Sequence, residues 1–92
     1  MNLAETEIEF KSSGEYFPFE ETGIKNNTIR KIDLTDYRFL LLISMMATKR
    51  YGTIKINNAE KPLKDEFFTR NIRHICIYDN YMLITWNPEE IK

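Results

Sequence analysis

The stretch IRHICIYDNYMLITW, residues Ile72 to Trp86, decides the fold class because it encodes a β-hairpin. Two runs rich in isoleucine, tyrosine and other strand-forming residues flank Asp79-Asn80, and both of these residues tolerate the positive φ of a two-residue hairpin turn. If this pair forms the whole loop, Tyr78 lies opposite Tyr81, and the register of the two strands follows.

The predicted hairpin has two faces of different polarity. One face carries the pairs Tyr78–Tyr81, Cys76–Leu83 and His74–Thr85, and the other carries Ile77–Met82, Ile75–Ile84 and Arg73–Trp86. The second face is almost wholly apolar, so we expect it to pack against a helix, with each buried side chain contributing about 1.5–3 kcal/mol. We expect Arg73 to form a cation–π pair with Trp86.

A helix is predicted from Asp36 to about Tyr51. Asp33 or Thr35 can cap its first turn through a side-chain oxygen, and Gly52 can supply the left-handed stop. The other expected elements are strands Glu5–Lys11, Thr28–Leu34 and Thr53–Asn57, a connection Ser12–Asn27, a turn Asn57–Pro62 and a helix start Asn87–Glu90. Strand, strand, helix and three strands predict an α+β fold: a small antiparallel sheet of about five strands with one helix across a face.

Length and cysteine content favour a single cytoplasmic domain spanning residues 1–92. Cys76 is the only cysteine, which excludes an intramolecular disulfide, and the longest apolar run, 39–43, is too short to span a membrane. One cysteine and one histidine cannot complete a tetrahedral zinc site, and the scattered glycines form no phosphate-binding loop. We therefore expect no metal and no cofactor.

Charge is distributed unevenly along the chain. Residues 1–24 hold six glutamates against Lys11, a net charge of −5, whereas residues 25–92 hold twelve basic against eight acidic residues, a net charge of +4. An acidic N-terminal arm (1–24) should therefore lie across the compact core (25–92) of its own chain or of a second copy. A pI near 5.8 argues against duplex nucleic acid as the main partner.

Two sets of apolar residues could cover each other. On the helix, Phe39, Leu40, Ile43, Met46 and Ala47 share the face expected to pack on the sheet, while Tyr37, Leu41 and Met45, with Leu42 beside them, form a second stripe. The arm supplies three aromatic rings, those of Tyr16, Phe17 and Phe19. If these rings pack on Leu41 and Met45 within one chain, the arm is structural; otherwise the six residues Tyr16, Phe17, Phe19, Tyr37, Leu41 and Met45 form an oligomer or partner interface.

The polar face of the hairpin is a second candidate surface. This face combines aromatic area with hydrogen-bonding tips, a mixture enriched at binding surfaces, at Tyr78, Tyr81, His74, Thr85 and Leu83. The pair Arg73–Trp86, at the strand ends on the other face, could form an edge for a planar or anionic ligand. The possible ligand surface is thus Arg73, His74, Tyr78, Tyr81 and Trp86. The alternative is that these pairs decorate a half-exposed sheet. Catalysis by a thiolate–imidazole pair is disfavoured, because His74 and Cys76 are neighbours at i and i+2 on a strand, ~7 Å apart.

These patterns favour a non-enzymatic binding protein that self-associates and occupies a surface of a macromolecular partner. The composition is rich in isoleucine, asparagine and lysine and lacks valine and glutamine, which indicates an AT-rich coding source and suggests a phage or mobile-element inhibitor of a host or defence protein. The alternative is a protein that sequesters a small anionic molecule or nucleotide in a pocket between copies.

Overall fold

The computed structural model describes residues 2–60 and 66–89. Within these residues the chain forms η1 (Leu3–Glu5), β1 (Glu7–Ser12), α1 (Phe17–Glu21), β2 (Asn27–Lys31), α2 (Tyr37–Thr48), β3 (Thr53–Asn58), β4 (Phe67–Tyr78) and β5 (Tyr81–Trp86). The five strands make one sheet in the order β1-β3-β4-β5-β2. The predicted α+β class, with about five strands and a packed helix, is therefore confirmed.

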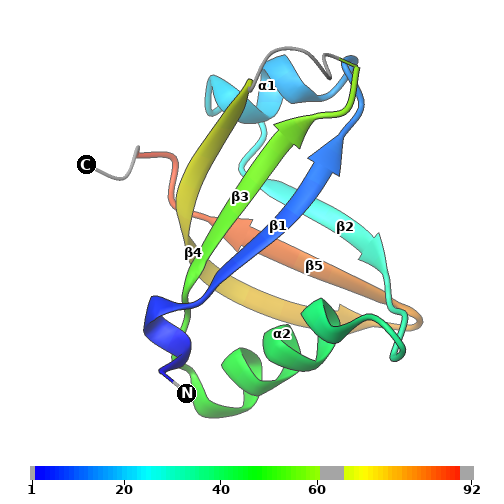
Figure 1. The fold of residues 1–92 in the computed structure, drawn as a ribbon, viewed down its shortest axis with the longest axis vertical. Helices are drawn as coiled ribbons and strands as arrows, with labels where there is room; N and C mark the ends of the chain where they lie inside the picture. The colour runs from blue at the N-terminus through cyan, green and yellow to red at the C-terminus, as the bar shows by residue number, and fades with distance from the viewer. Residues whose placement is uncertain (1, 61–65, 90–92) are drawn as a thin grey trace.

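The sheet is strongly curled. Figure 1 shows β1 and β3 running side by side, β5 and β2 crossing behind them in another direction, and the long, bent β4 joining the two parts. The short helix α1 lies at one end of the sheet and α2 at the other (Figure 1). The sequence predicts an antiparallel sheet, but β1 pairs parallel with β3, which the long crossover through α1, β2 and α2 makes possible.

The C-terminal hairpin has the predicted turn and, next to it, the predicted register. Asp79 takes a φ of 56° in the turn. The observed pairs are Tyr78–Tyr81, Ile77–Met82, Cys76–Leu83, Ile75–Ile84 and His74–Thr85. These pairs depend only on a local turn and on side-chain alternation, so sequence alone is sufficient to predict them.

A β-bulge changes the pairing at the far end of this hairpin. The register shifts between Ile72 and His74, so that Ile72 lies opposite Trp86. The predicted pair of Arg73 and Trp86 is therefore wrong, because Arg73 is the extra residue of the bulge and has no partner directly opposite it. β4 also begins at Phe67, because its first half pairs with β3 rather than with β5.

The ends of α2 differ from the prediction. The cap is Asp36, whose Oδ1 accepts a hydrogen bond from the backbone N–H of Arg38 at 3.0 Å. The helix ends earlier than expected, at Lys49, which takes the left-handed conformation with a φ of 56°. Gly52 is needed for space rather than for a left-handed stop, since a Cβ there would clash with the carbonyl oxygens of Thr6 and, at 2.6 Å, Leu3.

The expected connection 12–27 contains the short helix α1. Its first turn is stabilised by a hydrogen bond from the Phe17 N–H to the Ser13 carbonyl, and Pro18 occupies an early helical position where its missing N–H costs nothing. Phe17 is buried, and its ring centroid lies 5.4 Å from that of Phe68 on β4. The α1 part of the arm therefore covers the end of the sheet away from α2, whereas β1, in the same arm, is a strand of the sheet itself.

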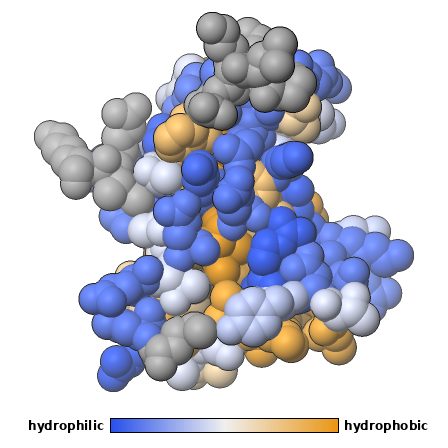
Figure 2. Space-filling view, viewed as in Figure 1, coloured by the Kyte–Doolittle hydropathy of each residue, from blue (hydrophilic) through white to orange (hydrophobic). Residues whose placement is uncertain are grey.

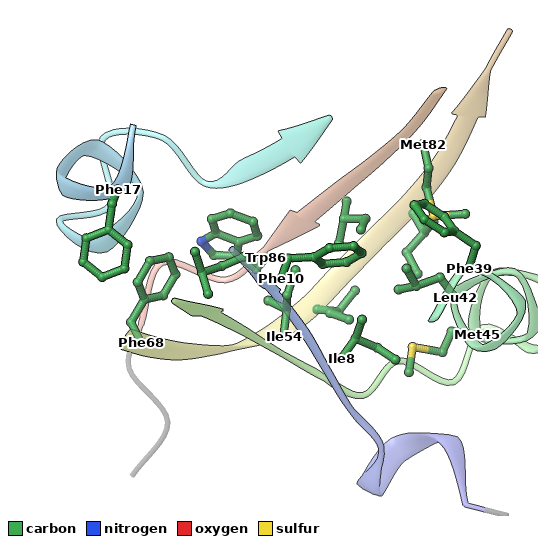
Figure 3. Packing of buried hydrophobic residues seen from close by; sticks show 14 residues of the cluster. Ile8, Phe10, Phe17, Phe39, Leu42, Met45, Ile54, Phe68, Met82 and Trp86 are labelled. Carbon is green, nitrogen blue, oxygen red and sulfur yellow. The ribbon is translucent and has the colours of Figure 1, made fainter. Parts of the chain in front are cut away.

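The predicted packing of the arm on the helix is consequently wrong. Tyr16 and Phe19 are exposed at α1, and Phe17 packs on β4 rather than on Leu41 and Met45. Figure 3 shows a continuous row of core side chains, from Phe17 and Phe68, through Phe10 and Ile54, to Leu42 and Met45 on α2.

The core face of α2 is rotated from the one predicted. Phe39, Leu42 and Met45 are buried, whereas Leu40 and Ala47 are exposed. Leu42 and Met45, assigned by the sequence to the second stripe, are core residues. Nearly every position from 39 to 47 is apolar, so periodicity alone cannot select the face that meets the sheet.

Two minor predictions fall partly outside the described residues. The turn 57–62 extends into 61–65, while β3 itself continues to Asn58. The helix start at 87–90 reaches residue 90, and Pro88 and Glu89 form a bend. The apolar hairpin face is buried as predicted at Ile75, Met82 and Ile84, although Ile77 near the turn is exposed.

Candidate functional site

The six residues of the predicted interface do not form one surface. Phe17 and Met45 are core residues, and Leu41 is half-buried against the core. Tyr16 and Phe19 are exposed at α1, and Tyr37 is 59% exposed at the start of α2. Because α1 and α2 lie at opposite ends of the sheet, these rings cannot form a common patch on one copy of the chain (Figure 1).

The largest ring of the predicted ligand surface on the hairpin, that of Trp86, is buried in the core. Trp86 is 0% exposed, and its ring centroid lies 5.9 Å from that of Phe68 in the core. The four other residues of this surface, Arg73, His74, Tyr78 and Tyr81, are exposed on the two strands. The indole ring is therefore not available beside Arg73 for a planar ligand to stack on.

The structure instead reveals a groove between the two edges of the sheet. β1 and β2 are the outermost strands of the sheet order, and two cavities of about 510 and 470 Å³ lie between them. We call this region the edge groove; it is lined by Glu9, Phe10, Lys11, Ser12, Ser13, Tyr16, Glu20, Lys25, Thr28, Ile29, Arg30 and Arg38. Lys11 and Arg30 line both cavities, so the two are adjacent.

Two arginines bridge the groove. Arg30, on β2, donates from Nη2 to the carbonyl oxygen of Lys11 at 2.9 Å, and Arg38, on α2, donates from Nη1 to the carbonyl oxygen of Glu9 at 2.6 Å. Both guanidinium groups lie against the ring of Phe10, with their central carbons 4.7 and 4.3 Å from its centroid. The buried Phe10 ring thus forms a platform that holds two positive charges close together.

The two arginines differ in how their charge is compensated. Arg38 forms an ion pair with Asp36 at 2.6 Å, and the hydrogen bond to that carboxylate raises the pKa of Arg38. Arg30 donates only to Thr28 Oγ1 and to the Lys11 carbonyl, and among the described residues no carboxylate lies within ion-pair distance of it. Burial lowers the pKa of Arg30, partly opposed by the attraction of Glu20 and reinforced by repulsion from Arg38.

The α1 end of the groove is built around a buried carboxylate. Glu20 is only 1% exposed; it accepts hydrogen bonds from the hydroxyl of Ser12 and from Lys25 Nζ, the latter at 3.0 Å. Lys25 also donates to the carbonyl of Asn27 at 2.6 Å and lies 5.9 Å from the centroid of the Tyr16 ring. Glu20 is therefore already paired and anchors the wall of the groove.

The groove suits an anionic ligand better than it suits catalysis. Its lining carries four basic side chains, Lys11, Lys25, Arg30 and Arg38, and two acidic ones, of which Glu20 is paired and Glu9 accepts a hydrogen bond from Asn57. It contains neither histidine nor cysteine, and the Ser12 hydroxyl is buried against Glu20. In the described part of the chain, no cluster of three or more histidine, cysteine or carboxylate groups could hold a metal ion.

The sequence gives only a weak signal for this site. Arg30 and Lys11 are two of thirteen basic residues, and strand alternation does not show that they meet across the sheet. Their proximity depends on the curl of the sheet, which a linear pattern does not encode. Figure 2 shows hydrophilic residues over most of the side of the molecule seen in Figure 1, with apolar residues in a strip between them and along the lower edge over α2.

In the described residues, none of the helices combines the length and apolar character needed to cross a membrane. The chain has no match among protein-family models, curated proteins or solved structures. The geometry and charge of the edge groove are therefore the features of this chain that point to a function.

Proposed function

We propose that this protein is a non-enzymatic binding protein that holds an acidic group of a macromolecular partner in the edge groove and thereby masks that partner's surface. The observation that carries the proposal is the state of Arg30. Its guanidinium is half-buried, is fixed by Thr28 and by the Lys11 carbonyl, and has no carboxylate partner among the described residues. A fixed, partly desolvated cation of this kind binds an anion more strongly than a solvated surface lysine does.

The neighbouring charges support an anionic partner. Lys11 is exposed at the junction of the two cavities, and Arg38 adds a second guanidinium over the Phe10 ring. Repulsion between Arg30 and Arg38 decreases when an anion enters between them, so binding removes an unfavourable interaction that exists in the free protein. The acidic side chains that could compete, Glu9 and Glu20, are already hydrogen-bonded.

Titration of ¹⁵N-labelled protein with poly-L-glutamate, followed by NMR, tests this proposal. The expected shifts cluster at Lys11, Ile29 and Arg30, weaken as salt concentration rises, and are absent with poly-L-lysine. Arg30→Ala should weaken binding at least fivefold, as expected when a charge-assisted hydrogen bond is lost. Arg73→Ala removes the same charge from an exposed site on β4 and is the matched control.

The opposite pattern would overturn the proposal. Shifts centred on His74, Tyr78 and Tyr81, with Arg73→Ala more damaging than Arg30→Ala, would assign binding to the hairpin face instead. No shift with any polyanion would remove the edge groove as a binding site.

A small anionic molecule, such as a nucleotide, is the second candidate ligand. The Tyr16 ring lines the larger cavity beside Lys25, and a volume of about 510 Å³ is in the range of small-molecule sites. An aromatic ring next to a cation suits a base and its phosphate. ATP at a hundredfold excess over its dissociation constant should then stabilise the protein by about 2.7 kcal/mol. An unchanged melting temperature in the presence of ATP, with poly-L-glutamate bound normally, would favour the macromolecular partner.

A further inference from the structure

We propose that the acidic partner segment enters the edge groove as an extended strand and adds to β1 as a sixth strand of the sheet. The inference rests on the proposed function, because it assumes that the groove binds an acidic ligand. It adds that recognition includes the main chain of the ligand, and that the ligand is an extended peptide rather than a folded surface or a free anion.

The outer edge of β1 has backbone groups available for pairing. The N–H of Thr53 donates to the Thr6 carbonyl, and the N–H of Ala59 donates to the Ser12 carbonyl. The backbone N–H and C=O groups of the even-numbered residues of β1 therefore point toward β3. Backbone groups alternate along a strand, and those of Glu9 and Lys11 therefore point away from β3 and into the edge groove. Both residues are exposed.

The edge of β2 forms the opposite wall of the groove. The N–H of Trp86 donates to the Asn26 carbonyl, and the N–H of Ile32 donates to the Asn80 carbonyl. The backbone N–H and C=O groups of the even-numbered residues of β2 therefore point toward β5. The backbone groups of Ile29 consequently face the groove, and Ile29 is one of the residues that line it. The pairing directions around the sheet make β1 and β2 antiparallel, so a strand between them runs parallel to one edge and antiparallel to the other.

Two arginine side chains occupy the positions where the N–H donors of an added strand would lie. Arg38 Nη1 and Arg30 Nη2 donate to the carbonyls of Glu9 and Lys11 along the outer edge of β1, where the N–H groups of an added strand would donate. These guanidinium groups keep the edge hydrogen-bonded in the free protein. When a strand pairs with β1, its own N–H groups take over the carbonyls and the released guanidinium groups can bind its carboxylates.

This exchange also defines the pattern of the ligand. Glu9 and Lys11 are two residues apart, and so are the ligand residues that pair with them. Both guanidinium groups lie against the Phe10 ring, on the face of β1 opposite to the side chains of Glu9 and Lys11. The glutamates or aspartates of the ligand are therefore the alternate residues whose side chains point to the Phe10 face. The expected ligand is thus an extended segment with acidic residues at every second position and small or β-branched residues between them.

A displayed library of random nine-residue peptides provides the test. The library is selected on the wild-type protein and counter-selected on Arg30→Ala, with Arg73→Ala as the charge-matched control. The most enriched peptide is then synthesised in three forms: one unmodified, and two that are N-methylated at alternate backbone amides, one in each of the two registers. N-methylation preserves charge and removes hydrogen-bond donors. Hydrogen exchange of the protein's Glu9 and Lys11 amides is measured with each form.

The proposal predicts an alternating acidic peptide that slows exchange at Glu9 and Lys11. N-methylation of the amides that face β1 should weaken binding by roughly tenfold or more, the effect of losing two hydrogen bonds. An acidic peptide that binds equally well when methylated in either register, without protecting these amides, would refute strand addition and leave anion binding intact. A selection that returns no peptide, together with poly-L-glutamate binding at Arg30, would likewise refute strand addition alone. Absence of both peptide and poly-L-glutamate binding would refute the proposed function as well.

Discussion

Arg30→Met should lower the free energy of unfolding by about 1–2 kcal/mol and reduce the stabilisation of the protein by polyanions. The substitution removes two hydrogen bonds of 2.9 Å, one to the Lys11 carbonyl and one to Thr28 Oγ1, and leaves the buried Thr28 hydroxyl without this donor. Hydrogen bonds that involve a charged group contribute about 1.5–3 kcal/mol each, so the gross loss is about 3 kcal/mol or more.

Part of this loss is offset. Methionine keeps an apolar stem over the Phe10 ring, and removal of the half-buried cation ends its desolvation cost and its repulsion from Arg38. We expect this to recover on the order of 1–2 kcal/mol, which gives the net value above. Lysine at the same position would retain the charge but not the fork of donors, and should not restore stability fully.

Urea unfolding followed by the fluorescence of the buried Trp86 measures this effect. Arg73→Met, at an exposed position, should change stability by no more than about 0.5 kcal/mol. With poly-L-glutamate at about a hundredfold excess over its dissociation constant for the wild type, the wild type and Arg73→Met should each gain about 2.7 kcal/mol. Arg30→Met, if it binds at least fivefold more weakly, should gain no more than about 1.8 kcal/mol. If Arg30→Met is as stable as the wild type and gains as much stability from poly-L-glutamate as the wild type does, the role assigned to Arg30 is wrong.

Three further predictions concern the fold and its surface. Gly52→Ala should destabilise the protein by about 3 kcal/mol or more, because the new Cβ meets backbone carbonyls. In Gly14→Ala the new Cβ meets only a flexible glutamate side chain, so this substitution should be nearly neutral. Thermal denaturation compares the two variants, and equal melting temperatures would contradict the close approach at Gly52. Met45→Glu should unfold the chain, because it buries a charge. Tyr37→Glu changes an exposed position and should leave the circular dichroism spectrum unchanged. If the exposed end of α2 joins two copies, Tyr37→Glu should also convert a dimer to a monomer, as measured by sedimentation velocity. Hydrogen bonds from Arg38 lower the pKa of Asp36 in the folded protein. The stabilising effect of the Asp36 carboxylate is therefore complete above the unfolded pKa of about 3.9 and is lost as pH falls through the lower folded pKa. Between pH 7 and pH 2, the melting temperature should fall less steeply for Asp36→Asn than for the wild type.

The sequence predicts those parts of the fold that depend on neighbouring residues. The hairpin turn at 79–80 and the register beside it follow from local turn chemistry and from alternation along the strands. The bulge after Ile72 is not predictable in this way, because it forms where β4 changes partner from β3 to β5. The error at Arg73 and Trp86 is thus a consequence of topology.

The same distinction explains the errors in α2 and the arm. Positions 39–47 are so uniformly apolar that the choice of core face depends on what the sheet offers rather than on the helix itself. From sequence alone, the ring of Phe17 could pack against any exposed apolar surface. The curl of the sheet is what places Phe68 next to it. The edge groove is least visible of all, because Lys11 and Arg30 are 19 residues apart and belong to strands at opposite ends of the sheet order.

The arrangement of Arg30 and Arg38 admits a purely protective reading, and one measurement separates it from a binding role. Exposed strand edges promote association between copies, and charged side chains commonly prevent it. If protection were the only role of the two guanidinium groups, removing Arg30 would free the β1 edge and increase self-association, with no effect on any ligand. If the groove binds an acidic strand, Arg30→Met should lose that ligand and sediment as the wild type does, because Arg38 still occupies the Glu9 carbonyl. Sedimentation velocity of the variant with and without an alternating acidic peptide therefore distinguishes a protected edge from a binding site, since only the first predicts larger species and only the second predicts loss of the complex.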